Sequence, residues 1–290
     1  MKLKICIIVI FVLTSCGLTF SQSLPKEDIS IKGKIIQEDN NQPLAYVSIG
    51  VVDKSLGTLT DTLGNFKFQI SQENLTDTLK ISLVGYVSKK IAVKDFIERK
   101  TKTIELRVKI TELAEVVVTN SKTNTEIIGR QGSGKLIQVS IHKKKSVEET
   151  IGSEMGMRYK TRHINATLKD FNFNISGNNF NYIKYRINIY SVKDNMPDTL
   201  IFNKQIFMTI DNYKTGWIKV DMEAYQIKVN QAFIVTIQWV ESSMKKKENP
   251  ITLIPVAMTL FSKNCYARIA SQDKWKKIGM NLSNFVTLIY

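Results

Sequence analysis

The sequence predicts an all-β protein made of two consecutive sandwiches, a small one followed by a larger, jelly-roll-like one. Three observations predict this. Apolar and polar residues alternate with a period of two over most of the chain, as in strands that bury one face. Clusters of Gly, Asn and Asp separate these runs at short intervals, as turns do. Only 2 His and 3 Cys occur in 290 residues, so apolar burial must hold both cores together.

The N-terminal segment 1–22 has the layout of a secretory signal peptide. Two lysines precede an apolar stretch that is shorter than the roughly 20 residues of a membrane-spanning helix. We expect cleavage after Ser21 or Gln22. The alternative is a lipid anchor, because residues 13–16 look like a bacterial lipobox in which Cys16 would be lipidated. Both alternatives predict export, and no transmembrane segment is expected in the mature chain.

The chain is strongly basic, with 41 Lys and Arg against 26 Asp and Glu and a formal net charge of +15. A basic surface attracts polyanions, which for an exported protein are phosphorylated lipid head groups or acidic glycans. Nucleic acid is not expected as a partner, because arginine is scarce and no recognition motif occurs. Outside the leader the cysteine of the chain is Cys265, so no intrachain disulfide, metal site or cofactor is predicted.

Residues 29–106 contain short alternating segments separated by turns, which predicts a small sandwich without helices. The segment 61–64 fits a tight reversal, with Gly64 taking a positive φ at no steric cost. The expected strands cover residues 31–35, 45–51, 57–60, 65–70, 79–83, 87–93 and 103–106.

A family resemblance runs through the same residues. The ordered features that carry it are Gly33, Pro43-Leu44, Ala45, Val47, Gly57, Thr60-Asp61, Gly64 to Phe66, and Val84-Gly85-Tyr86. Their order and spacing resemble the carboxypeptidase regulatory-like domain. That resemblance implies a seven-stranded transthyretin/Ig-like sandwich for residues 23–110. It also implies a structural turn motif made by Gly57, Asp61, Gly64, Gly85 and Tyr86.

Residues 113–119 resemble the segment that joins this domain to the plug of TonB-dependent outer-membrane receptors, where the domain lies in the periplasm. The remaining chain is too short for a receptor barrel of about 22 strands, so transport is not implied. Peptidase activity is not implied either. Zinc carboxypeptidases need a closely spaced pair of ligands and a second His, whereas His142 and His163 each stand alone.

Residues 111–134 are predicted to link the two sandwiches, because their later part is rich in Ser, Thr, Asn and Gly. Residues 129–135 come close to a phosphate-binding P-loop. Leu136, however, stands where Ser or Thr must hold magnesium, and the following residues alternate like a strand instead of starting a helix. The segment therefore predicts a Gly-rich entry to the second sandwich and no nucleotide site.

From residue 135 to 290 the sequence again predicts strands, with one short helical turn within 146–156. In the strand around Tyr185, the apolar side chains face one way while Lys184, Arg186 and Asn188 face the other. The number of strands fits a two-sheet jelly-roll-like sandwich. The expected strands lie at 168–175, 183–189, 199–210, 217–222, 226–229, 232–241, 251–261, 265–270 and 285–290.

Three aromatic residues of the second sandwich are candidates for ligand binding, because the faces of sugars stack on aromatic rings. Trp275 is the best exposed candidate, since it lies among charged residues, and its neighbour would be Tyr266 or Tyr213. Trp217 follows a glycine at the start of a strand. Trp239 alternates in register with apolar residues and is predicted to pack in the core instead.

Catalytic signals are weak. The acids in or near strands are Asp170, Asp221, Glu223 and Glu241, and Asp221 and Glu223 share a face only if their strand continues. The sequence therefore predicts a non-catalytic binding or assembly module, exported to the periplasm or outer-membrane surface of a Gram-negative bacterium. Its partner would be an envelope protein, a glycan or an anionic surface. The alternatives are a glycan- or polyanion-binding protein of a polysaccharide-utilisation system, and a glycan hydrolase with paired carboxylates.

Overall fold

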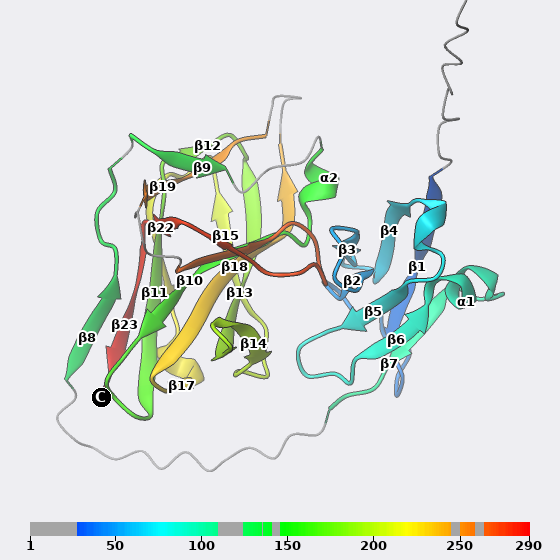
Figure 1. The fold of residues 1–290 in the computed structure, drawn as a ribbon, viewed down its shortest axis with the longest axis horizontal. Helices are drawn as coiled ribbons and strands as arrows, with labels where there is room; N and C mark the ends of the chain where they lie inside the picture. Colours follow the sequence, from blue (N-terminus) through cyan, green and yellow to red (C-terminus); the bar gives the residue numbers. More distant parts are fainter. Residues whose placement is uncertain (1–27, 110–123, 135, 141–145, 245–249, 259–263) are drawn as a thin grey trace, which may run out of the picture.

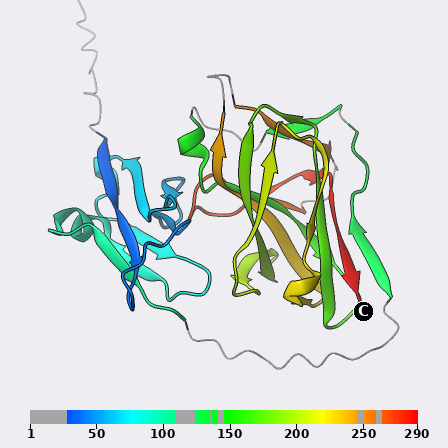
Figure 2. The same cartoon turned by 180° about the vertical axis from the view of Figure 1, so that it is seen from behind.

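The computed structural model describes residues 28–109, 124–134, 136–140, 146–244, 250–258 and 264–290. They form two β-sandwiches side by side (Figure 1), and Figure 2 shows the pair from behind. Strands dominate, which confirms the predicted all-β class. The predicted signal peptide, Cys16 and the segment 113–119 lie outside the described residues. Within the described parts of the chain, no helix has the length and apolar character needed to cross a membrane.

The first sandwich has the seven strands that the resemblance implies. One sheet has the order β4 (Asn65–Ile70), β1 (Ile29–Gln37), β7 (Thr103–Leu106). The other has the order β3 (Gly57–Leu59), β2 (Ser48–Val51), β5 (Thr78–Ser82), β6 (Lys89–Ala92). Apolar side chains from both sheets, including Ile35, Ile49 and Ile81, are buried in a shared core.

A short helix interrupts these strands, which corrects the expectation that the first sandwich has none. The helix α1 (Val93–Glu98) directly follows β6, and a 3-10 turn, η1 (Gln72–Asn74), precedes β5. Val93 and Phe96 are three residues apart, so a single helical turn places both in the core. The sequence signal was missed because the change from period two to period 3.6 lasts for only six residues.

Four of the five residues assigned to the turn motif lie in or beside turns. Gly64 has a φ of 79° and Gly85 a φ of 83°, a region that favours glycine. Oδ1 of Asp61 accepts hydrogen bonds from two backbone N–H groups of its own turn, at 2.9 and 2.8 Å. The hydroxyl of Tyr86 donates to a glutamine of β1 at 2.9 Å. Gly57, in contrast, begins β3, and its role is described below.

The second sandwich has two large antiparallel sheets and a smaller one. The strand order of the first large sheet is β14 (Met196–Leu200), β13 (Tyr182–Lys193), β18 (Ala232–Ser243), β10 (Glu154–Lys160), β20 (Cys265–Arg268), β21 (Lys276–Ile278). A further strand of this sheet, β15 (Ile206–Asp211), also pairs with β13. The second contains β16 (Gly216–Asp221), β11 (Ala166–Ile175), β23 (Asn284–Ile289) and β8 (Thr125–Gly129), with β17 (Lys228–Val229) also on β11. The smaller sheet contains β12 (Gly177–Asn178), β19 (Thr252–Met258), β22 (Met280–Leu282) and β9 (Gln138–Ser140).

Among the described residues of the second sandwich, the helical elements are α2 (Val147–Thr150), inside the predicted segment 146–156, and the 3-10 turn η2 (Glu223–Tyr225). The strand β8 lies within the predicted linker 111–134. It pairs with β23 at the opposite end of the chain, so the second sandwich starts before residue 135. The sequence does not predict this strand, because β8 is extended through its pairing with β23 and its own residues give no strand signal.

The two faces of the first large sheet have different partners. Tyr185 and Ile187 of β13 and Trp239 of β18 point into the apolar core of the second sandwich, as predicted. The side chains between them point the other way, toward the first sandwich. Because strand residues alternate between faces, this register decides which polar groups meet at the boundary between the two sandwiches.

Candidate functional site between the two sandwiches

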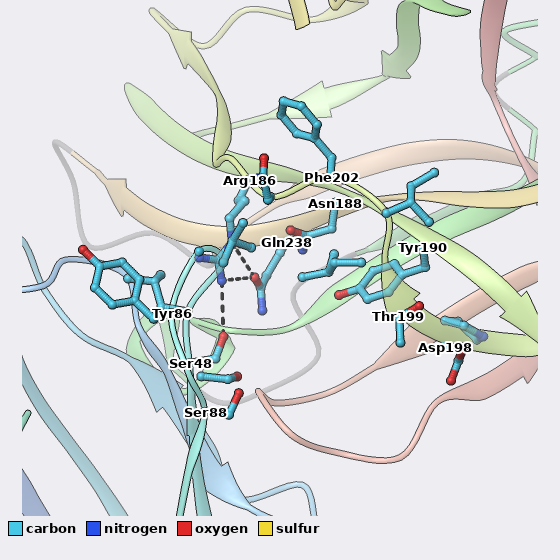
Figure 3. A pocket seen from close by; sticks show the side chains of 18 of the residues that line it. Ser48, Tyr86, Ser88, Arg186, Asn188, Tyr190, Asp198, Thr199, Phe202 and Gln238 are labelled. Carbon is cyan, nitrogen blue, oxygen red and sulfur yellow. Dashed lines mark hydrogen bonds between the residues drawn. The ribbon is translucent and has the colours of Figure 1, made fainter. Parts of the chain in front are cut away.

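Four polar side chains form a row across the first large sheet, on the face turned away from its core. Arg268 of β20 is in register with Glu154 of β10, Glu154 with Gln238 of β18, and Gln238 with Arg186 of β13. Glu154, Gln238 and Arg186 are buried. At the Arg186 end of this polar row, the first sandwich covers the sheet. Figure 3 shows Ser48 of the first sandwich opposite Arg186, from which it accepts a hydrogen bond.

Glu154 is the anion of the polar row, and its side chain is fully buried. Oε2 accepts from Nη2 and Nε of Arg268 at 2.5 and 2.9 Å. Oε1 accepts from Asn188 at 2.8 Å, from Tyr190 at 3.1 Å and from Thr236. Burial raises the pKa of Glu154, but the charge of Arg268 and these hydrogen bonds lower it by more, so the net pKa is below its ordinary value. Glu154 is therefore ionised at neutral pH.

Arg186 is a buried cation that joins the two sandwiches. Nε and Nη2 both donate to Oε1 of Gln238, at 3.0 and 2.5 Å, and Nη1 donates to Gln205 at 3.1 Å. Across the boundary, Nη1 donates to the carbonyl oxygen of Tyr46 at 2.9 Å and Nη2 to Oγ of Ser48 at 3.2 Å. Burial lowers the pKa of Arg186, although a guanidinium stays protonated in proteins. These five hydrogen bonds end on four acceptor atoms, and all four are neutral.

Tyr46 makes the complementary contacts from the first sandwich. Its hydroxyl donates to Glu241 at 2.7 Å and accepts from Lys184 at 2.9 Å, and this bond raises the pKa of Lys184. Its ring packs edge-on against Phe207, with centroids 5.3 Å apart. Tyr46 also has a φ of 59°, which is unusual for a bulky residue. The strained backbone directs its carbonyl oxygen to Arg186 while its side chain reaches Lys184.

A loop of the second sandwich lies against β2 and β3. A Cβ on Gly57 would lie 2.7 Å from the carbonyl oxygen of Ser271, and a Cβ on Gly50 would contact the same atom. Gln272 donates from Nε2 to Oγ of Ser82 at 2.7 Å. Gly57 and Gly50 are therefore needed for close approach of two backbones, a role different from the turn that the sequence suggested.

These contacts surround a cavity of about 910 Å³ between the sandwiches, here called the interdomain cavity. Its volume lies within the range of small-molecule sites. Hydroxyl and amide groups line it together with the rings of Tyr86, Tyr190, Phe202, Tyr225 and Trp275. The lining includes five bases (Lys80, Lys109, Arg186, Lys228 and Arg268) and three acids (Asp53, Asp198 and Asp273). Figure 3 shows side chains from both sandwiches pointing toward this space.

Residues 31–118 match the family model of the CarboxypepD_reg-like domain. The first sandwich is a carboxypeptidase regulatory-like domain. A comparison with curated proteins finds no match. Among solved structures, the chain is similar to two structures of Cwp84, one described as the cysteine protease and lectin-like domains of a surface layer associated protein of Clostridium difficile. The identities are 10% and 11%, the TM-scores 0.38 and 0.39, and both alignments cover 92% of this chain. This chain spans 64% and 72% of those chains.

The structure brings two of the three predicted ligand-binding aromatics together. Trp275 lines the interdomain cavity. One face of its indole is covered by the guanidinium of Arg268, 4.6 Å from the ring centroid, and Tyr190 packs edge-on against it. Tyr266 is beside them but is only 1% exposed, so its ring is not open to a ligand. Trp217 lies in the other large sheet, is 36% exposed and packs on Phe285.

The acids that the sequence offered for catalysis are dispersed. The strand β16 ends at Asp221, and Glu223 begins η2, so the two do not share a strand face. Asp170 is buried beside Lys219, at 3.3 Å. Glu241 is at the domain boundary with Lys184, at 3.7 Å. Within the described residues, no group of three His, Cys, Asp or Glu could hold a metal ion.

Sequence reasoning places Arg186, at one end of the polar row, and misses Glu154 within the row. Arg186 was placed on the polar face of its strand because it alternates with apolar neighbours. Glu154 was assigned to a segment expected to hold a helical turn. Its own alternation with the buried Met155 and Met157 would have indicated a strand. The partners of Glu154 come from three other strands, and such long-range pairing has no local signal.

Proposed function

We propose that the protein is a non-catalytic binding or assembly module of a bacterial cell envelope, in which the regulatory-like domain and the second sandwich act as one body. The observation that carries this proposal is Arg186, which donates five hydrogen bonds to four neutral acceptor atoms on both sides of the boundary. A buried guanidinium with every N–H group engaged fixes one geometry. The shape that a partner meets is then made by both domains together.

The bonding of Glu154 supports a non-catalytic function. Its two carboxylate oxygens accept five hydrogen bonds, two of them from Arg268. Its pKa is below the ordinary value, whereas a carboxylic acid that donates a proton near neutral pH needs a raised pKa. Glu154 thus acts as a structural anion under the interdomain cavity.

The proposed location is the periplasm or the outer-membrane surface of a Gram-negative bacterium. Two features support it: the signal-peptide layout of residues 1–22 and the resemblance of residues 113–119 to the segment that precedes the plug of outer-membrane receptors. Mass spectrometry of the mature N-terminus would show cleavage near Ser21 or a lipid on Cys16. An uncleaved leader would contradict export by this route.

The assembly function is tested by purifying the tagged full-length protein from the envelope of its own host after mild cross-linking. We expect one envelope protein to co-purify at fixed stoichiometry and to remain bound in high salt. An unrelated exported protein with the same tag is the control. Failure to recover any stoichiometric partner would contradict an assembly function.

The second candidate function is that of a glycan- or polyanion-binding protein of a polysaccharide-utilisation system. The interdomain cavity favours it, because a volume of about 910 Å³ accommodates a ligand larger than an ion. Hydroxyl, amide, aromatic and basic side chains share its wall, which is the mixture that polar ligands with hydroxyl and acidic groups require. The chemistry of that ligand is developed in the next subsection.

A further inference from the structure

Lys80 is a cation on the wall of the interdomain cavity. It projects from β5 of the regulatory-like domain and is partly buried. No described residue forms a side-chain hydrogen bond or ion pair with its Nζ. Burial, and next the positive charge of Arg268, lower the pKa of Lys80. The charge of Asp53 opposes this shift, but no described carboxylate forms an ion pair with Nζ of Lys80. A partly desolvated ammonium group without a contacting counter-ion is costly, so this side of the cavity favours an anionic ligand group.

Arg268 supplies the second cation, from the opposite domain. Nε and Nη2 of its guanidinium are bound to Glu154, and Nη2 also contacts Tyr190. No described residue accepts a hydrogen bond from Nη1, which carries two N–H groups. The indole of Trp275 holds the guanidinium plane from one side at 4.6 Å. Arg268 is therefore held by three side chains, it lines the cavity, and no described residue uses the donors of its Nη1.

The charge around these donors is only slightly basic. Five bases and three acids line the cavity, and Glu154 beneath it compensates Arg268. A ligand group with a single negative charge fits this balance better than a dianionic phosphate. A carboxylate also matches both donors, because its two oxygens can accept from an ammonium and from a guanidinium N–H at the same time.

The remainder of the wall indicates what carries the carboxylate. Hydroxyl and amide side chains, including Ser82, Asn188 and Thr199, lie among the rings of Tyr86 and Tyr225. Such a lining offers hydrogen bonds to many hydroxyl groups and flat apolar surfaces between them. Sugars present both features, whereas an acidic peptide presents backbone amides and flexible side chains.

We propose that the interdomain cavity binds an acidic oligosaccharide whose carboxylate is held between Nζ of Lys80 and Nη1 of Arg268. This inference deepens the second candidate function and rests on it. It gives the positive charge of the chain a specific use at one site. It also explains why both domains are needed, since each contributes one of the two cations.

The test measures binding of short oligogalacturonate, in which every sugar carries a carboxylate, to the full-length protein by isothermal titration calorimetry. Lys80→Met removes one donor, and we expect the affinity to fall about tenfold to a hundredfold. Lys90→Met is the matched control: Lys90 is the cross-strand neighbour of Lys80, is exposed and does not line the cavity. It makes the same change in net charge and is expected to bind as the unmodified protein does.

Arg268→Lys provides a second variant that keeps a cation beside Glu154 and removes the two N–H groups of Nη1. It is expected to weaken oligogalacturonate binding by about tenfold or more, with the folded state verified by circular dichroism. Equal losses in Lys80→Met and Lys90→Met would show a diffuse charge effect and overturn the site.

Three further outcomes would overturn the proposal: no binding of oligogalacturonate, equal binding of neutral galacto-oligosaccharides of the same length, or equal binding of oligoglutamate. The first outcome would show that the cavity does not bind acidic oligosaccharides. The second would show that the carboxylate does not contribute to binding, and the third that the cavity does not distinguish a saccharide from an acidic peptide. The co-purification of an envelope protein is measured independently. If a partner co-purifies while oligogalacturonate fails to bind, the assembly function stands and the cavity inference falls.

Discussion

Glu154 illustrates how one buried carboxylate makes the stability of this protein depend on pH. Burial raises its pKa, but Arg268 and the surrounding hydrogen bonds lower it further, to below the value in an unfolded chain. Ionised Glu154 therefore stabilises the fold above its unfolded pKa, and this contribution is lost as the pH falls through its folded pKa. We expect the urea midpoint to be steady near neutral pH and to fall steeply below about pH 4. Urea titrations followed by tryptophan fluorescence at a series of pH values measure this.

The variant Glu154→Gln tests whether that carboxylate is responsible. It keeps the size of the side chain but removes the carboxylate paired with Arg268, of which only 13% of the side chain is exposed. Breaking a buried ion pair costs about 3–5 kcal/mol, so the urea midpoint at neutral pH should fall and the loss of stability in acid should become shallower. Glu105→Gln, on the exposed face of β7, is the control. If the loss of stability in acid is the same in Glu154→Gln as in the unmodified protein, other titratable groups cause it.

At the scale of the element, β2 and β3 need glycine where the loop that contains Ser271, from the second sandwich, packs against them. The Cβ of an alanine at position 57 would lie 2.6 Å from the carbonyl oxygen of Ile49 and 2.7 Å from that of Ser271. Both carbonyl oxygens belong to the backbone, so the steric clash with the added Cβ can be removed only if a strand or the loop moves. We expect Gly57→Ala to lower the free energy of unfolding by about 1–3 kcal/mol. Gly279→Ala, where no atom lies within 4 Å of the added Cβ, should have a far smaller effect.

The elements that the sequence predicted well are those whose signal is local. The strands around Ile35, Phe66 and Tyr185 alternate clearly because one face of each is buried, and period two reports that burial directly. The strand β8 lacks such a signal, since its two isoleucines are adjacent and do not alternate with polar residues, and it forms a strand by pairing with β23. The polar row depends on the register of four strands, which is set by contacts far apart in the chain. The sequence predicts Trp275 as a ligand-binding residue, whereas Arg268, which packs on its ring, could be found only from the fold.

At the scale of the whole molecule, the contacts of Arg186 and Tyr46 predict that the two domains unfold together. Interfaces between domains of one chain often allow relative motion, but here a buried cation donates two hydrogen bonds across the boundary. The hydroxyl of Tyr46 adds a hydrogen-bonded pair with Lys184 and Glu241. Loss of either domain would remove these hydrogen bonds, so the unfolding of one domain removes stabilisation from the other.

Differential scanning calorimetry of Arg186→Met tests this coupling. The unmodified protein should unfold in one transition. The variant leaves the acceptors of Gln238, Gln205 and Tyr46 without their donor, which costs about 2–4 kcal/mol, and it should unfold at lower temperature with the two domains resolved. Arg162→Met, an exposed site in the second sandwich, makes the same chemical change away from the boundary and should leave the single transition in place. If Arg186→Met melts as one transition at the temperature of the unmodified protein, Arg186 does not couple the domains, and the claim that they act as one body loses its main support.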